Sequence, residues 1–376
     1  MAALRAQGTP GWAGQVTAGV SHATRGGTPG PGPWTVATAY VGTVVGAGFA
    51  SGQETLQFFT AYGPLGLAGL LVAALLFAWF GVRVLLFGHA LNAVSHGPLI
   101  RGLAGPQLAP VIDGLLVFFL LGTAATMVSG ASATMLEQYG WPREYGALLM
   151  AGAATLTVLT GLRGVVNALA FFAPLLIGSV LGIAVYSLAT GPGVAGAMAW
   201  PGDLALAAAG PWWLGAVLYV AYNMVLSIPI LGSLGAAVGH RSTLMAGGAL
   251  GGVLLSLGAG AIHLTVASFM PEAAALDIPM LYAARSLPAW VPAVYSFLLL
   301  GEVYTTAVAM LYSFAARIGP EGTARFRAAV VGGGVLALVG GLFRFSQVIG
   351  TFYPLMGLLG IVLLLLLLRP VPGARK

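Results

Sequence analysis

Two glutamates inside apolar stretches are the side chains of this chain best placed to do chemistry. Glu54 follows a glycine-rich segment, and Glu302 precedes the pair Thr305 and Thr306. A third apolar stretch contains the amide side chain of Asn223. Because a charge or an amide in apolar surroundings needs a partner or a ligand, these positions indicate binding of an ion, a proton or a polar solute.

The chain lacks the residue patterns of most enzymes. It contains no cysteine, and its only lysine is the final residue, Lys376, so the internal lysine of a P-loop ATPase is missing. Ser51 and His263 are a conceivable nucleophile and base, but no Gly-x-Ser-x-Gly motif surrounds Ser51. No histidine has carboxylates at metal-ligand spacing. We therefore expect a protein that is not an enzyme and that has no organic cofactor.

Composition places these residues in a lipid bilayer. Of the 376 residues, 59% are hydrophobic and 6% are charged, whereas about 25% are charged in typical soluble domains. Long apolar stretches separated by short polar breaks are typical of a polytopic helical membrane protein. We expect helices over residues 34–62, 65–92, 110–137, 145–161, 165–190, 212–238, 242–267, 290–317, 326–343 and 346–368.

The arginines predict the orientation of these ten helices. With a cytoplasmic N-terminus, twelve basic residues fall on the cytoplasmic side and three, Arg143, Arg285 and Arg344, fall outside. Cytoplasmic loops carry the excess of positive residues, so both termini are expected in the cytoplasm of a bacterial-type inner membrane. This distribution accounts for the net charge of +6 without a nucleic-acid partner.

Helix order predicts an internal repeat. Residues 34–190 and 212–368 each contain five predicted helices and are equally long. An odd number of spans reverses the second half, which is the inverted repeat common in secondary transporters. Residues 1–33 would form a disordered cytoplasmic tail, 191–211 an extracellular connector and 369–376 a second cytoplasmic tail.

The first helix contains a candidate interruption. The stretch Gly46-Ala47-Gly48 falls in the middle of the span, and glycine is a poor helix former. Ser51 and Glu54 have the spacing of a capping box, which indicates that a helix restarts there. Close helix packing through small residues is the alternative interpretation.

The sixth helix contains a matching candidate at Pro229, which cannot donate an amide hydrogen bond. Ser227 precedes it and is able to cap a new helix, although a simple proline kink is the alternative. A restarted helix offers free N–H groups that suit a carboxylate, and an ended helix offers free carbonyls that suit Na⁺.

The stretch from Gly46 to Glu54, Gly-Ala-Gly-Phe-Ala-Ser-Gly-Gln-Glu, resembles the first-helix signature of the YkvI-like membrane proteins. These proteins are relatives of the amino acid–polyamine–organocation transporters, which have the LeuT-type fold. Asn223 and the stretch from Glu302 to Thr306 are supporting matches. The resemblance implies an all-α membrane protein with ten transmembrane helices in a five-plus-five inverted repeat, with helices 1 and 6 broken.

The resemblance also implies a sodium site. In sodium-coupled members of the wider group, carbonyls of the first helix and hydroxyls of the eighth hold one Na⁺. By similarity, the ligands here would be the carbonyls of Gly42 and Val45 and the hydroxyls of Thr305 and Thr306. Some proton-coupled relatives have a lysine on helix five instead, and residues 165–190 contain none, which favours Na⁺.

These observations together favour a cation-coupled symporter of a small organic solute of amino-acid type, embedded in the bilayer, with Na⁺ preferred to H⁺. The expected substrate-binding residues are Gly46, Ala47, Gly48, Phe49, Thr126, Tyr222, Asn223 and Ser227. Glu54 and Glu302 are expected to act in coupling or gating. A proton-coupled transporter that uses Glu54 and a non-transporting membrane sensor on the same fold are the alternatives, and the oligomeric state stays open.

Overall fold

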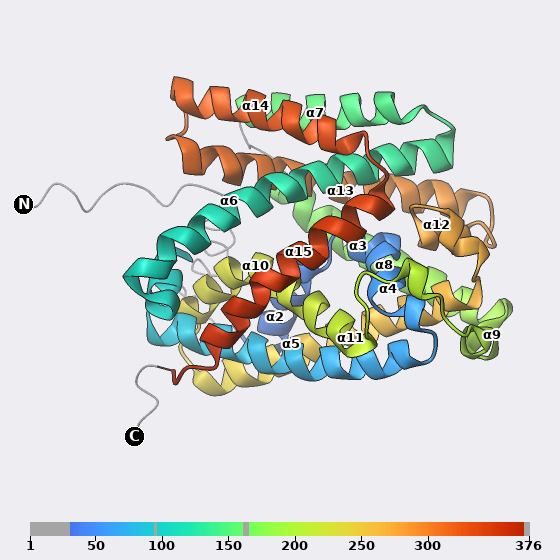
Figure 1. Ribbon diagram of the computed structural model, residues 1–376, viewed down its shortest axis with the longest axis horizontal. Helices are drawn as coiled ribbons and strands as arrows, with labels where there is room; N and C mark the ends of the chain where they lie inside the picture. The colour runs from blue at the N-terminus through green and yellow to red at the C-terminus, as the bar shows by residue number, and fades with distance from the viewer. Residues whose placement is uncertain (1–30, 94–95, 161–164, 372–376) are drawn as a thin grey trace, which may run out of the picture.

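The chain is helical throughout the part that the computed structural model describes, residues 31–93, 96–160 and 165–371 (Figure 1). The expected tails 1–33 and 369–376 lie largely outside these residues. The longer helices are α5 (Leu65–Ala90), α6 (His96–Tyr139), α7 (Arg143–Thr160), α8 (Val165–Thr190), α10 (Trp212–Ala237), α11 (Arg241–Ser268), α13 (Trp290–Ile318), α14 (Ala324–Gly341) and α15 (Phe345–Leu367). Most follow the predicted spans to within a few residues, but α6 begins fourteen residues earlier and contains a non-helical Gly105.

The first predicted helix is interrupted three times, at residues 45–46, at Gly52 and at Phe59, which confirms the prediction of a break. It consists of α2 (Pro33–Val44), α3 (Ala47–Ser51), α4 (Gln53–Phe58) and the short η1 (Thr60–Tyr62). The backbone is extended at Val45 and Gly46 and left-handed at Gly52, where φ is 80°. Glycine adopts the left-handed conformation at little cost, so Gly52 is able to end α3 and start α4.

The predicted capping box does not form at this restart. Ser51 Oγ instead donates to the carbonyl of Gly48 at 2.8 Å and accepts from the amide of Gln53 at 3.2 Å. The Glu54 side chain points to Tyr222 rather than back to the cap. The turn at Gly52 therefore restarts the helix without the side-chain cap.

The predicted break in the sixth helix is wrong, because α10 runs without interruption through Pro229. Ser227 does not cap a new helix, since its hydroxyl accepts from Thr43 at 3.0 Å. Proline removes one backbone donor, a loss that a well-packed membrane helix tolerates. From Tyr222 to Pro229 the helix also has no glycine, in contrast to the interrupted first helix.

Eight helices among the described residues are long and apolar enough to cross a membrane. The two predicted spans outside this set are the interrupted first helix, whose pieces are short, and α7, which begins with the charged Arg143 and Glu144. The prediction of several membrane-spanning helices is confirmed, whereas the exact number of ten stays a prediction.

The helices form two groups joined by α10, α15 and α6. The lower group in Figure 1 contains α2, α5 and α11, and the upper group contains α7, α13 and α14, while α6 and α15 cross between them. Close approaches depend on glycine: a Cβ at Gly235 of α10 would lie 2.1 Å from the carbonyl oxygen of Leu85 in α5. Short elements, among them α9 (Gly193–Ala199), η2 (Leu204–Leu206), η3 (Glu272–Ala275) and α12 (Pro279–Ala284), lie in the loops.

Candidate functional site

A pocket of about 280 Å³ lies where the first helix is interrupted. Its walls come from the α2–α3 junction, α4, α6, α10, α13 and α15. The predicted residues that line it are Gly42, Val45, Gly46, Ala47, Gly48, Glu54, Tyr222, Asn223, Glu302 and Thr306. The structure therefore brings together the break, both intramembrane glutamates and part of the predicted ion site.

Glu54 is held over the break by its neighbours. It lies in the first turn of α4, its side chain is 5% exposed, and it accepts a hydrogen bond from the hydroxyl of Tyr222 on α10. Its carboxylate folds back onto Gly48, where a Cβ would lie only 1.8 Å from Glu54 Oε1. Glycine at position 48 is thus what allows the carboxylate to reach Tyr222.

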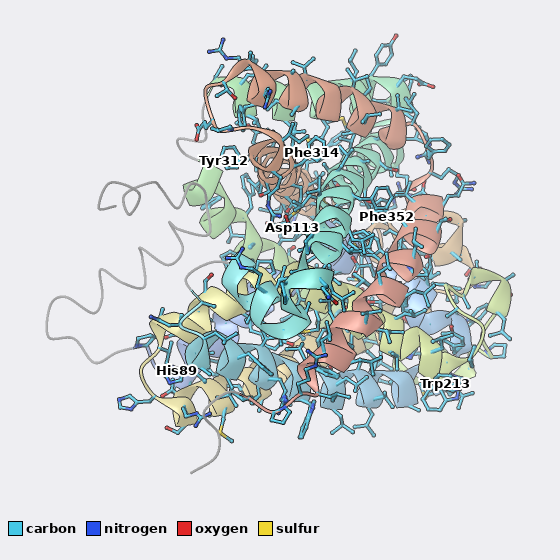
Figure 2. All side chains as sticks on the ribbon, turned by 60° about the vertical axis from the view of Figure 1, so that its left-hand side comes forward. His89, Asp113, Trp213, Tyr312, Phe314 and Phe352 are labelled. Atoms are coloured by element: carbon cyan, nitrogen blue, oxygen red, sulfur yellow. The ribbon has the colours of Figure 1, made fainter. Side chains whose placement is uncertain are left out.

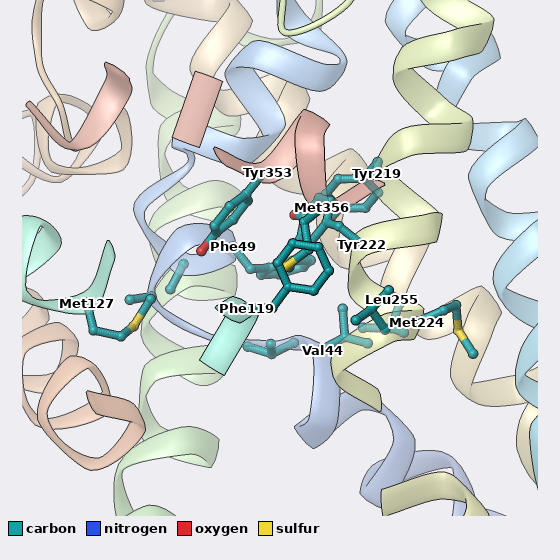
Figure 3. Close-up of a cluster of buried hydrophobic side chains, with 14 of the residues drawn as sticks. Val44, Phe49, Phe119, Met127, Tyr219, Tyr222, Met224, Leu255, Tyr353 and Met356 are labelled. Carbon is teal, nitrogen blue, oxygen red and sulfur yellow. The ribbon is translucent and has the colours of Figure 1, made fainter. Parts of the chain in front are cut away.

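Aromatic rings surround this carboxylate. The ring centres of Tyr222 and Tyr353 are 4.7 Å apart, and those of Tyr222 and Phe58 are 5.6 Å apart. Figure 3 shows Tyr222 and Tyr353 beside Phe119 in the buried cluster. A carboxylate among aromatic faces suits an ammonium group, which both attract.

Glu302 forms a second acidic point on the α13 wall. Its side chain is 3% exposed, and Oε2 has no hydrogen-bond partner in the described part of the chain. Thr306, four residues later and thus on the same face of the helix, lines the pocket as well. Thr305 is buried outside the pocket lining, and its hydroxyl donates to the carbonyl of Glu302 at 3.0 Å.

Three predicted substrate residues lie outside the pocket lining. Phe49 packs beside Gly258 of α11, and Ser227 is bonded to Thr43. Thr126 donates to the carbonyl of Gly122 within α6 at 2.9 Å. Asn223 does line the pocket, although its amide nitrogen donates to the carbonyl of Tyr219 within α10.

Thr123 and Tyr353 are among the pocket residues that the sequence did not predict. Thr123 lines the pocket from α6 with a hydroxyl that has no partner in the described residues, one turn before Thr126. Tyr353 lines it from α15. The only local signal for Tyr353 in the sequence was its position next to Pro354.

The pocket continues toward one end of the molecule. Along α13 its lining runs from Glu302 to Arg317, near the end of the helix. There Arg317 forms an ion pair with Asp113 of α6. Figure 2 turns this end toward the viewer, with Asp113 and Tyr312 labelled.

At the opposite end of the molecule, an ionic network around Asp277 joins several elements. The side chain of Asp277, between η3 and α12, is fully buried, accepts from Arg143 at 2.5 Å and from the amide of Ser346 at 3.2 Å, and lies 3.6 Å from Arg344. Burial raises the pKa of this carboxyl, but the hydrogen bonds from Ser346 and Arg143 outweigh it and leave the pKa below its usual value. Glu137 of α6 binds the amide of Asp277 at 2.5 Å.

Further hydrogen bonds to loop residues hold the elements together at the end of the molecule that contains Asp277. The indole of Trp200 donates to the carbonyl of Thr60 at 2.9 Å, and the amide of Asp203 donates to the carbonyl of Ala61 at 2.8 Å. From α4, the side chain of Gln57 donates to the carbonyl of Ser346 in α15 at 2.7 Å. These bonds tie α4 and η1 of the interrupted helix to the loop after α9 and to α15.

Comparisons by sequence find relatives that span nearly the whole chain. The chain is 29% identical over 346 residues to the uncharacterized membrane protein YkvI of Bacillus subtilis (strain 168), which covers 91% of this chain and 97% of that protein. It is 25% identical over 332 residues to the uncharacterized protein YyaD of the same organism, with 88% and 95% covered. No family model matches the chain.

Comparisons of structure find transporters. The TM-score is 0.60 against MhsT in complex with L-phenylalanine, at 18% identity over 83% of this chain and 79% of that one. The TM-score is 0.57 against the inward-facing conformation of Mhp1, at 18% identity over 89% of this chain and 75% of that one. It is also 0.57 against a Na⁺-coupled sialic acid symporter in an outward-open state, at 11% identity over 93% and 87%.

At such identities a structural likeness concerns the fold, and the function has to be argued from the site. The apolar helices, the interrupted first helix and these neighbours agree in one respect. The chain is a multi-pass membrane protein with the LeuT-type fold.

Proposed function

We propose that this protein is a cation-coupled secondary transporter that carries a small organic solute of amino-acid type, with Na⁺ as the preferred coupling ion. The observation that carries this proposal is the interruption of the first helix at Val45 and Gly46, which opens onto a pocket containing the buried carboxylate of Glu54. Backbone interrupted at membrane depth is tolerated where it lines a cavity, as in transporter binding sites.

The cargo would meet Glu54 and the aromatic rings around it. An ammonium group would pair with the carboxylate and lie against the ring of Tyr353 or Tyr222. The one arginine among the pocket residues, Arg317, is already paired with Asp113. Recognition of an ammonium group is therefore better supported than recognition of a carboxylate.

The ion would bind where α2 ends. The last helical bond of α2 runs from the amide of Val45 to the carbonyl of Val41, so the carbonyls that follow, from Gly42 to Val45, belong to the free end of the helix. Together with the hydroxyls of Thr305 and Thr306 they would give an oxygen-only ligand set, which suits a hard cation such as Na⁺.

The transport cycle would alternate access to this pocket. With both termini in the cytoplasm of a bacterial-type inner membrane, the end at Arg317 faces inward and the network at Asp277 closes the outer side. The described state is then inward-open. The direction of the pocket and the outer network support this assignment.

Uptake into proteoliposomes tests the proposal. A thermal-shift screen of the standard amino acids and of the amines left when their carboxyl group is removed, with and without Na⁺, would first identify a cargo. We expect uptake of the radiolabelled hit to depend on an inward Na⁺ gradient. Uptake that follows a pH gradient alone would favour the proton-coupled alternative at Glu54, and uptake that ignores both gradients would refute coupling.

A further inference from the structure

Glu302 is a buried acid with a carboxylate oxygen that has no partner in the part of the chain that the structure describes. Its side chain is 3% exposed, Oε2 has no hydrogen-bond partner among the described residues, and the residue lines the pocket. An ionised carboxylate out of water is costly unless a positive charge or hydrogen bonds compensate it. The carboxylate therefore has to be neutralised by a proton or by a cation that the described side chains do not supply.

No basic side chain of the pocket is close enough to compensate it. Arg317 is fifteen residues further along the same helix, which places it about 22 Å away along the helix axis, and it is paired with Asp113. The other acid of the pocket, Glu54, is occupied by the hydroxyl of Tyr222. A cation that neutralises Glu302 has to come from solution.

The surroundings of Glu302 supply further oxygen ligands. Thr306 lines the pocket one turn later, and Gly42 and Val45 line it from the free end of α2. Carboxylate, hydroxyl and carbonyl oxygens together form a typical hard-cation ligand set.

We propose that the carboxylate of Glu302 is itself a ligand of the coupling Na⁺, so that the ion site carries a fixed negative charge. This inference rests on the proposed function, whose ligands are all neutral carbonyls and hydroxyls, and it adds a charged one. The charge makes the site selective for a cation, and a bound Na⁺ would compensate the ionised form of Glu302. The two acids of the pocket then have separate tasks, Glu302 for the ion and Glu54 for the cargo.

Sodium-dependent thermal stability tests the role of Glu302 without a known cargo. The purified full-length protein is unfolded by heating at increasing NaCl, with N-methyl-D-glucamine chloride keeping the ionic strength constant. A ligand that binds the folded state raises the melting temperature with its concentration. We expect a saturable rise for the wild type, and for Glu302→Gln either no rise or a half-saturating concentration at least tenfold higher.

Two further variants and a control sharpen the result. Glu302→Asp keeps the charge and should retain a weakened response, and Thr306→Ala should weaken the response without abolishing it. Glu144→Gln makes the same chemical change at an exposed residue outside the pocket and should respond like the wild type.

The outcomes separate this inference from the proposed function. A sodium response in Glu302→Gln equal to that of the wild type would overturn the role of Glu302 and leave the proposed transporter intact. No response in the wild type would remove Na⁺ coupling, and the role of Glu302 with it. If Glu302→Gln does not fold, as judged by size-exclusion chromatography, unchanged half-saturation in both Glu302→Asp and Thr306→Ala would overturn the inference.

Discussion

At the scale of single residues, Gly48 determines where the carboxylate of Glu54 can lie. Alanine at this position would put its Cβ 1.8 Å from Oε1 and 2.6 Å from Cδ of Glu54. The glutamate would have to rotate away and lose the hydrogen bond from Tyr222. We expect Gly48→Ala to destabilise the protein by about 1–3 kcal/mol, the usual effect of disrupting a buried hydrogen bond, and thermal unfolding in detergent measures it.

Gly46→Ala is the matched control for this prediction. Gly46 lines the same pocket, and a Cβ there would meet nothing within 4 Å. Its φ of −140° is accessible to alanine. If Gly48→Ala acts through Glu54, adding Glu54→Gln to it should have less effect than Glu54→Gln has in the wild type. Equal effects of the two glycine variants would contradict the argument.

At the scale of elements, the sequence predicted the features that depend on local backbone conformation. The break of the first helix was predictable because glycines at 42, 46, 48 and 52 weaken it within eleven residues. The continuity of α10 was not, because one proline is compatible with either a break or a tolerated defect. The choice depends on packing around Pro229 and on the bond between Thr43 and Ser227, residues that are 184 positions apart.

Side-chain direction was the other limit on prediction. Thr123, rather than the predicted Thr126, lines the pocket, although three residues along a helix differ by only about 60° in direction. The two intramembrane glutamates were predictable because a charge in an apolar stretch stands out. Tyr353 was not, since an aromatic residue in an apolar helix gives no such contrast.

The ionic network around Asp277 connects the segment between η3 and α12 to α6, α7 and α15. It gives a prediction that depends on pH. Asp277→Asn keeps an acceptor for the amide of Ser346 but removes the charge that faces Arg143 and Arg344. We expect it to lower the stability of the protein by about 1–3 kcal/mol at neutral pH. Because the pKa of Asp277 is lowered in the folded state, this contribution is complete above the unfolded pKa and is lost as the pH falls through the folded one.

The part of the difference in melting temperature between wild type and Asp277→Asn that comes from the Asp277 charge should therefore shrink below about pH 4, where an aspartate begins to protonate. Asp203→Asn is the control. Asp203 is exposed and caps η2 by accepting from the amide of Ala205 at 2.9 Å, a task that asparagine performs equally well. A difference that stays unchanged well below about pH 4 would mean that the Asp277 charge is not responsible.

At the scale of the whole molecule, the charges predicted to lie outside gather at one end. Arg143 and Arg344 both face Asp277, and Arg285 donates to the carbonyl of Glu137. In Figure 1 the loop elements α9 and α12 mark this end on the right, and the C-terminus lies at the left. The pocket extends away from the arginine end, so the two ends of the molecule should differ in access to it.

Single-cysteine labelling tests this difference, because the chain has no cysteine of its own. Ala309→Cys would place a thiol in the pocket lining of α13, and Glu144→Cys would place one on the surface next to Arg143. In sealed vesicles a membrane-impermeant thiol reagent should reach the two cysteines from opposite sides, the one at 309 from the side of the predicted cytoplasmic loops. Labelling of both from the same side would mean that the pocket opens toward the arginine end, and the inward-open assignment would be wrong.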